Sequence, residues 1–136
     1  MYPELRILLI DDEEEILIPL AQLLKMEGYH VQTVMSSITA LEMIKESKYH
    51  IVLSDIVMPE MNGLELLSHI KEYDPLAQVI MMTGYSTMET TMLSLEKGAA
   101  DYILKPFKNF EDVVKVVKMS EEKLNRWWES MRGNFK

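Results

Sequence analysis

The stretch RILLIDDEEEILIPLAQLLKMEGYHVQTV, residues 6–34, is the most informative part of the sequence about the fold class. It opens on a short apolar run, continues with apolar residues at helical spacing, and reaches Gly28 before the short stretch HVQTV. Apolar side chains three or four positions apart mark a helix with one buried face, and glycine commonly follows the end of such a helix. The stretch therefore predicts a strand, a helix and a second strand, which is the unit from which parallel sheets are built.

The same alternation of short apolar runs and longer helical patterns continues along the chain. Nearly continuous runs of Val, Ile, Leu and Met are typical of strands that helices cover on both faces. We expect strands over residues 6–10, 30–34, 51–54, 79–82 and 102–104. The pattern predicts an α/β fold, a doubly wound five-stranded parallel sheet with helices on both faces.

Helix starts are marked by a capping side chain three residues before an acid. Four such pairs occur: Asp12 with Glu15, Asn62 with Glu65, Ser86 with Glu89, and Asn109 with Asp112. The acids at positions 13, 14 and 15 are expected to be ordinary first-turn residues, which the helix dipole favours there.

The last helical pattern is longer than a five-stranded sheet needs. It begins near Asn109 and continues through Trp127 and Trp128 to Met131, which corresponds to roughly 33 Å of helix. We expect one folded domain over residues 1–120 and a C-terminal helical extension or linker over residues 121–136. Two interpretations of the extension remain open: a frayed tail whose tryptophans fold back on the domain, or a helical linker or dimerising arm.

Composition and charge exclude several classes of function. The net charge is −8, from 22 acidic and 14 basic residues, so the chain lacks the basic footprint of a nucleic-acid-binding domain. The absence of cysteine excludes disulfides, thiolate metal sites and thiol nucleophiles. No apolar run approaches the roughly 18 residues that span a membrane, and the start does not resemble a secretory signal. We therefore expect a cytoplasmic protein that does not insert into membranes.

Polar side chains stand at the end of four predicted strands. Asp11 and Asp12 follow the first strand, Asp55 the third, Thr83 the fourth and Lys105 the fifth. Ligands of open parallel sheets bind beyond the carboxyl ends of the strands, so we expect these side chains to share one pocket. Each has an ordinary alternative as a cap, a turn residue, a β-branched strand end or a surface lysine, but their joint occurrence favours a site.

Charge balance explains why these residue types belong together. Three crowded carboxylates repel one another and need a cation, and oxygen ligands favour a hard ion such as Mg²⁺. An ionised Asp55 is also a nucleophile toward phosphorus. The additional negative charge of an aspartyl phosphate would be offset by Mg²⁺, by the Lys105 ammonium and by a hydrogen bond from the Thr83 hydroxyl.

Four motifs in order resemble those of one known family. They are Leu8-Leu9-Ile10-Asp11-Asp12-Glu13, the segment SDIVMPEMNG over residues 54–63, Met82-Thr83-Gly84, and the segment GAADYILKPF over residues 98–107. On these motifs the chain resembles a response-regulator receiver domain of two-component signalling over about residues 4–120. The resemblance implies the fold of chemotaxis receivers, with strand order 2-1-3-4-5.

The resemblance also implies roles for individual residues. Asp55 would accept the phosphoryl group from a histidine kinase or a phosphotransfer protein, and Asp11, Asp12, Asp55 and the Val57 carbonyl would hold Mg²⁺. Thr83 and Tyr102 would switch conformation, Lys105 would pair with the phosphoryl group, and the Lys105–Pro106 bond would be cis. A homodimer through helix four, strand five and helix five, or through the C-terminal helix, is a further expectation.

Two positions are expected to affect how long the phosphoryl group stays. Val57 and Tyr85 stand two residues after Asp55 and Thr83, and neither can orient an attacking water as a carboxylate or amide would. We therefore expect slow loss of phosphate. The segment MTGYS over residues 82–86 resembles receivers that precede ATPase-type transcriptional activators.

Three other functions compete with this interpretation. An aspartate-nucleophile, Mg²⁺-dependent phosphohydrolase usually carries a second acid two positions after the nucleophile, where this chain has Val57. A flavin-binding electron carrier needs a first loop that cradles phosphate, whereas the acids of residues 11–15 would repel one. A pure interaction module with a vestigial site would not be expected to retain all five key residues.

Overall fold

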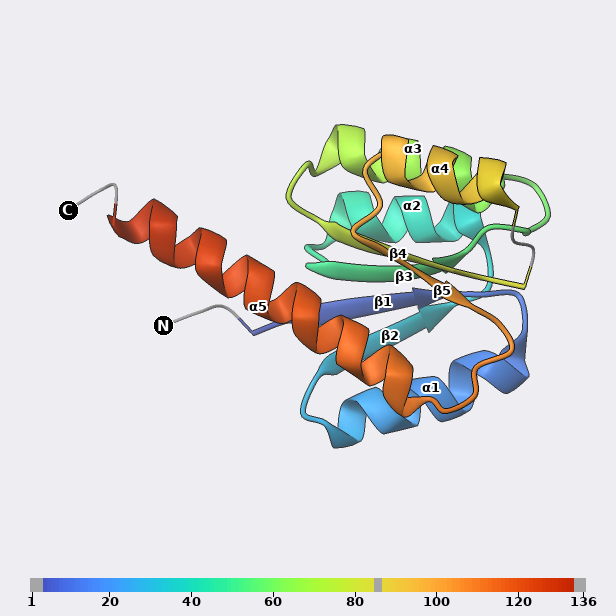
Figure 1. Ribbon diagram of the computed structural model, residues 1–136, viewed down its shortest axis with the longest axis horizontal. Helices are drawn as coiled ribbons and strands as arrows, with labels where there is room; N and C mark the ends of the chain where they lie inside the picture. Colours follow the sequence, from blue (N-terminus) through green and yellow to red (C-terminus); the bar gives the residue numbers. More distant parts are fainter. Residues whose placement is uncertain (1–3, 85–86, 134–136) are drawn as a thin grey trace.

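The computed structural model describes residues 4–84 and 87–133. Within them, five parallel strands form one sheet in the order β2-β1-β3-β4-β5, as expected (Figure 1). The strands are β1 (Arg6–Ile10), β2 (His30–Val34), β3 (Ile51–Asp55), β4 (Gln78–Thr83) and β5 (Asp101–Leu104). The first two match the predicted bounds, and the other three extend them by one or two residues. The extensions place Asp55 and Thr83 inside the hydrogen-bonded sheet.

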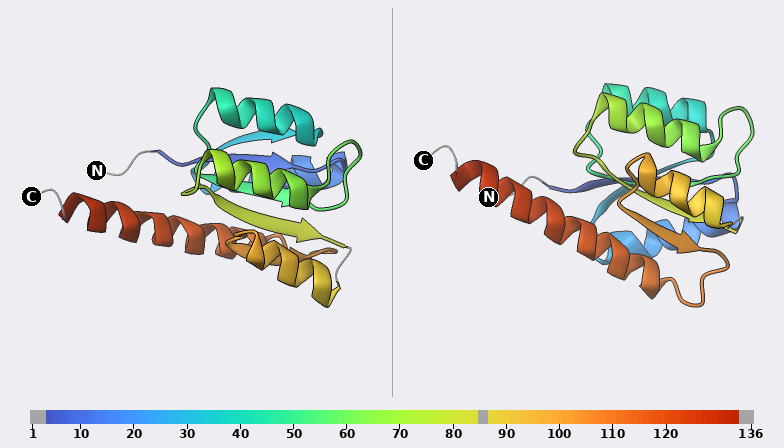
Figure 2. Two further views of the ribbon diagram at one scale, coloured as in Figure 1. Left: turned by 90° about the horizontal axis from the view of Figure 1, so that it is seen from above. Right: turned by 45° about the horizontal axis from the view of Figure 1, so that its top comes forward.

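Five helices in the described residues cover the sheet on both faces, which confirms the doubly wound prediction. They are α1 (Glu14–Met26), α2 (Ser37–Glu46), α3 (Gly63–Tyr73), α4 (Met88–Glu96) and α5 (Glu111–Gly133). Figures 1 and 2 show α1 and α5 on one face and α2, α3 and α4 on the other. An apolar core fills each interface, because most strand residues are buried on both sides of the sheet.

The helix caps follow the predictions only in part. The Asn62 side chain accepts a hydrogen bond from the Glu65 N–H at 2.9 Å, as expected. The Asn109 side chain accepts instead from the Glu111 N–H at 2.9 Å. The predicted Ser86 cap lies outside the described residues. Helix α4 is capped by Thr87 in a reciprocal pair with a threonine three residues on, and not with an acid.

The predicted cap of α1 is wrong. The N-cap is Glu13, one residue later than expected, and its side chain makes no capping hydrogen bond. The carboxylate of Asp12 belongs to a cluster of acids at the sheet edge. It is therefore not used to satisfy the start of the helix.

Helix α5 continues without a break to Gly133 and extends past the sheet (Figures 1 and 2). Its beginning packs against the sheet through Val113, and Leu124 is 2% exposed within the same core. The Trp128 ring lies edge-on to the His50 ring at 5.8 Å between centroids. Helix α5 is thus continuous to Gly133, and Trp128 contacts the domain.

His50 precedes β3 at the end of the sheet away from its carboxyl edge. Its Nδ1 accepts a hydrogen bond from the Arg6 N–H at 3.1 Å, so this nitrogen is unprotonated. Burial lowers the pKa of the imidazole below its ordinary value, Lys48 and Arg6 lower it further, and Asp74 opposes them.

Among the helices of the described residues, none combines the length and apolar character needed to cross a bilayer.

Candidate functional site

The polar residues predicted at the strand ends meet at the carboxyl edge of the sheet. Asp11 follows β1, Asp55 ends β3, Thr83 ends β4 and Lys105 follows β5. In Figure 1 this edge is where the strand arrowheads point. The edge includes the point where the chain reverses its direction of winding between β1 and β3, the usual position of a site in this type of sheet.

Four carboxylates form the centre of the site. Asp11, Asp12, Glu13 and Asp55 each offer one oxygen, and these four oxygens lie within 4.8 Å of one another. Asp11 and Asp55 are buried, whereas Asp12 and Glu13 are exposed. Oxygen ligands grouped in this way suit a hard divalent cation, which would also relieve their mutual repulsion. The donor set therefore fits a metal ion such as Mg²⁺.

Lys105 connects three of these carboxylates. Its Nζ lies 2.6 Å from Asp11 Oδ2, 3.1 Å from Asp55 Oδ2 and 3.2 Å from Glu13 Oε1. Burial by itself lowers the pKa of the Lys105 ammonium, but the hydrogen bonds and charges of Asp11 and Asp55 outweigh it and raise this pKa above its ordinary value. Lys105 is therefore a fixed positive charge in the site.

Asp11 is buried and held by two donors. Burial raises the pKa of its carboxyl above the ordinary value, even though Lys105 and the Glu13 N–H act to lower it. The Glu13 N–H donates to Asp11 Oδ1 at 2.9 Å, while Lys105 contacts Oδ2. Both oxygens are thus held in place by donors, so the orientation of the carboxylate is fixed.

Asp55 is held by the backbone that follows it. Its Oδ1 accepts a hydrogen bond from the Ile56 N–H at 2.7 Å, which leaves Oδ2 directed at Lys105. The Gly63 N–H donates to the Ile56 carbonyl at 2.7 Å, so the start of α3 packs directly on the end of β3. A Cβ at position 63 would lie 2.0 Å from the Asp55 carbonyl oxygen. Only glycine allows this approach.

Thr83 and Tyr102 occupy neighbouring strands beside the site. Thr83 is buried, and its carbonyl accepts the Lys105 N–H at 3.0 Å. Tyr102 packs into the core between the sheet and α2 and α3, and its buried hydroxyl has no hydrogen-bond partner among the described residues. The Lys105–Pro106 bond is cis, as the resemblance implied.

The remaining predicted positions are less constrained. The Val57 side chain is 57% exposed two residues after Asp55. Tyr85 lies outside the described residues. Glu13 was expected to be an ordinary first-turn acid, yet it is the N-cap residue of α1 and its carboxylate belongs to the site. The sequence signals for this are its position directly after two site aspartates and its place at the end of the first motif, residues 8–13.

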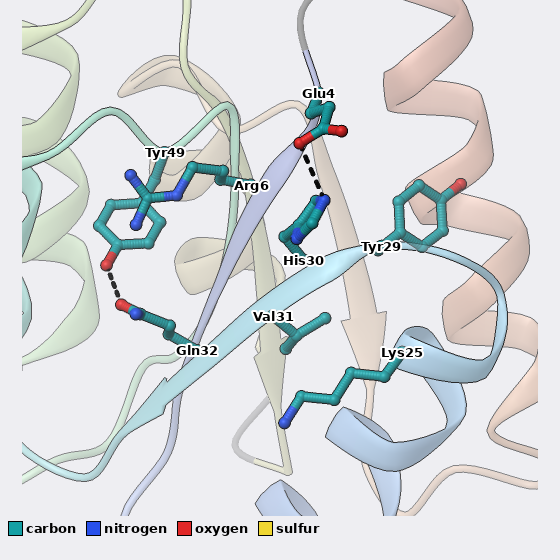
Figure 3. Close-up of a pocket in the computed structure, with 8 residues that line it drawn as sticks. All are labelled: Glu4, Arg6, Lys25, Tyr29, His30, Val31, Gln32 and Tyr49. Carbon is teal, nitrogen blue, oxygen red and sulfur yellow. Dashed lines mark hydrogen bonds and ion pairs between the residues drawn. The ribbon is translucent and has the colours of Figure 1, made fainter.

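A separate hollow of about 540 Å³ lies at the amino ends of β1 and β2, away from the carboxylates (Figure 3). Its polar groups pair with one another: His30 lies 3.1 Å from Glu4, the Tyr49 hydroxyl donates to Gln32, and the Arg6 guanidinium lies over the Tyr49 ring. These pairs leave few polar groups for a ligand, so the carboxylate cluster remains the candidate site.

Comparisons with known proteins agree with this geometry. Residues 7–118 match the family model described as response regulator receiver domain. The transcriptional regulatory protein ZraR of Klebsiella oxytoca is 40% identical over 100 residues, which cover 74% of this chain and 23% of that protein. This chain thus spans about a quarter of the length of the curated relatives it matches.

Solved structures show the same fold. A CheY-like receiver domain protein from Methanospirillum hungatei has a TM-score of 0.85 at 35% identity, over 94% of this chain and 99% of that one. The beryllofluoride-activated NtrC4 receiver domain dimer has a TM-score of 0.82 at 34% identity, over 87% and 97% of the two chains. From the family match and these likenesses, the chain belongs to the response regulator receiver domain family of two-component signalling.

Proposed function

We propose that this receiver domain accepts a phosphoryl group on Asp55 and stores it as a signal. The observation that carries the proposal is the Lys105 bridge between Asp11 and Asp55, set within a cluster of four carboxylates. An acid that is buried, fixed and placed beside a permanent positive charge is suited to hold a transferred phosphoryl group.

The donor we propose is the phosphohistidine of a histidine kinase or phosphotransfer protein. A carboxylate oxygen of Asp55 forms the new bond to phosphorus while the phosphorus–nitrogen bond of the donor breaks. The electron pair of that bond goes to the donor imidazole, which takes up a proton. Lys105 offsets negative charge on the phosphoryl oxygens, because its ammonium already lies 3.1 Å from Asp55 Oδ2.

The cofactor we propose is Mg²⁺, held by the carboxylates of Asp11, Asp12 and Asp55 and by the Val57 carbonyl. When bound, it would supply positive charge that neutralises the phosphoryl oxygens. The role of the chain is to group the oxygen ligands before the ion arrives. The 4.8 Å span of the cluster supports this assignment.

The switch we propose runs through Thr83 and Tyr102 to α4. Thr83 stands at the end of the strand next to Asp55, and the buried Tyr102 hydroxyl is available for a new partner. Of the nine described residues of α4, only Ser94 is fully buried. A helix with so little buried surface can shift between two arrangements at low cost.

The readout we propose is a partner or an output domain in a cytoplasmic regulator, with no direct contact of this chain with nucleic acid. A homodimer could form through α4, β5 and α5, where Met92, Leu95 and Leu104 are exposed, or through the C-terminal part of α5 beyond residue 120. The NtrC4 receiver domain similar to this chain is a dimer when activated by beryllofluoride, which supports a dimer here without selecting one of these two surfaces. Sedimentation with and without beryllofluoride would show whether activation changes the oligomeric state.

The test of storage against turnover uses a small phosphodonor. The protein is incubated with acetyl phosphate and Mg²⁺ and followed by intact mass and by released inorganic phosphate. A lasting gain of one phosphoryl group, absent in Asp55→Asn, supports the receiver function. Continuous phosphate release without a modified protein would instead support an aspartate-nucleophile phosphohydrolase.

A further inference from the structure

Glu13 is a residue of the site to which the family resemblance assigns no role. Its backbone is fixed on both sides: its N–H donates to Asp11 Oδ1 at 2.9 Å, and its carbonyl accepts the N–H groups of Ile16 and Leu17. As the N-cap it is extended, with φ −101° and ψ 102°, and its side chain makes no capping hydrogen bond. The carboxylate is therefore free to reach the site.

The Glu13 carboxylate reaches the same ammonium that bridges the two buried aspartates. Glu13 Oε1 lies 3.2 Å from Lys105 Nζ. The Glu13 side chain is 47% exposed, whereas those of Asp11 and Asp55 are nearly enclosed. It is also one of the four carboxylates within 4.8 Å of one another. Because the Glu13 carboxylate contacts Lys105 and also faces solvent, its negative charge acts on ions that enter the site.

We propose that Glu13 tunes the site by charge, favouring the divalent cation and slowing the capture of anionic phosphodonors. This inference rests on the proposed phosphoacceptor function. The four carboxylates and Lys105 together carry a net charge of −3, and without Glu13 the site would carry −2. The additional negative charge attracts a divalent cation, and by the same field it repels a donor that carries negative charge.

Removing the Glu13 charge should weaken Mg²⁺ binding but speed phosphorylation, and a general loss of structure would not produce this combination. For a charge about 5 Å from the cation, partly screened by salt, Glu13→Gln should weaken Mg²⁺ binding by about three- to tenfold. At saturating Mg²⁺, the same variant should be phosphorylated by acetyl phosphate about two- to fivefold faster at low donor concentration. A misfolded site would lose both properties together.

The matched control is Glu14→Gln. Glu14 is the next acid along, exposed in the first turn of α1, and its carboxylate is not one of the four in the cluster. Because Glu13→Gln and Glu14→Gln remove the same charge one residue apart, a local effect should appear only at position 13. Glu13→Asp keeps the charge and should retain most of the cation affinity.

The experiment measures Mg²⁺ binding by calorimetry and the initial rate of phosphorylation by intact mass for the unmodified chain and these three variants. Weaker Mg²⁺ binding with faster phosphorylation in Glu13→Gln alone supports the proposal. Equal effects of Glu13→Gln and Glu14→Gln, or Mg²⁺ binding unchanged in Glu13→Gln, would overturn it. If the unmodified chain neither binds Mg²⁺ nor gains a phosphoryl group, the proposed function itself fails.

Discussion

Replacing Gly63 with alanine should separate the start of α3 from the end of the strand that carries Asp55. The added Cβ would lie 2.0 Å from the Asp55 carbonyl oxygen and 2.8 Å from the Ile56 Cα. Both are backbone atoms of a buried strand end, so no flexible side chain can move aside. To reach an ordinary contact of 3.4 Å, the helix must move by about 1.4 Å.

The cost has two parts. Forcing a methyl group into a packed backbone contact typically costs about 1–3 kcal/mol. The same movement stretches the 2.7 Å hydrogen bond from the Gly63 N–H to the Ile56 carbonyl, and a buried backbone group that loses its partner costs about 1–3 kcal/mol more. We therefore expect Gly63→Ala to lower the free energy of unfolding by about 2–5 kcal/mol.

Urea unfolding followed by circular dichroism measures this difference, with Gly84→Ala as the control. Gly84 also adjoins the site, but a Cβ there would meet Lys105 at 3.8 Å, which is an ordinary contact. The control should change the free energy of unfolding by less than about 1 kcal/mol. A Gly63→Ala protein as stable as the Gly84→Ala protein would refute the close packing of α3 on β3.

Three further predictions concern His50, helix α5 and the two positions expected to slow phosphate loss. Burial lowers the pKa of folded His50 below its ordinary value of 6.5, so near and below pH 6.5 the unfolded chain binds more protons than the folded chain. The free energy of unfolding should therefore fall as the pH drops below 6.5. Urea titrations on either side of pH 6.5 should show this fall, and His50→Gln should reduce it. Leu124→Ala should lower the free energy of unfolding by about 2–5 kcal/mol, because Leu124 is buried. Met119→Ala, at a residue that is 60% exposed, should lower it by less than about 0.5 kcal/mol. Equal losses in urea unfolding would show that α5 does not pack as described. Val57→Asn combined with Tyr85→Glu should speed phosphate loss from the phosphorylated protein, because the introduced amide and carboxylate can orient an attacking water. Intact mass followed over time measures the rate of loss. An unchanged rate would contradict the hypothesis that Val57 and Tyr85 slow this loss.

Apolar runs made the sheet predictable. A strand covered on both faces needs nearly continuous apolar sequence, so the run ILLI within residues 6–10 predicts the buried strand β1. The edge strand β2, HVQTV, is mostly exposed and has a weaker apolar signal. The pattern places Asp55 and Thr83 directly after their strands, because polar site residues do not continue the apolar signal. Backbone pairing with the neighbouring strand extends each strand instead.

Helix caps were less predictable because one side chain can serve two purposes. The Asp12 carboxylate fits a capping motif and also fits a cation site, and in the fold it belongs to the site. At α4, the Thr90 hydroxyl takes the reciprocal place that the pattern assigned to an acid. Local sequence contains no information on which of two polar partners a side chain will face.

The convergence of the site residues could be inferred, but its details could not. Parallel strands bring their carboxyl ends to one edge, so Asp11, Asp55 and Lys105 were expected to meet there. The direction of the Glu13 carboxylate depends on the extended backbone of an N-cap, which no residue pattern specified. The close approach at Gly63 depends likewise on how α3 docks on β3.

Asp55 is the proposed phosphoacceptor, and mapping the modified residue is a direct test of that assignment. The protein is phosphorylated by acetyl phosphate in Mg²⁺, digested and sequenced by tandem mass spectrometry, with a chelator control. We expect one alkali-labile, hydroxylamine-labile phosphoryl group on Asp55, formed only when a divalent cation is present. A phosphoryl group on another residue, or undiminished labelling of Asp55→Asn, would contradict it.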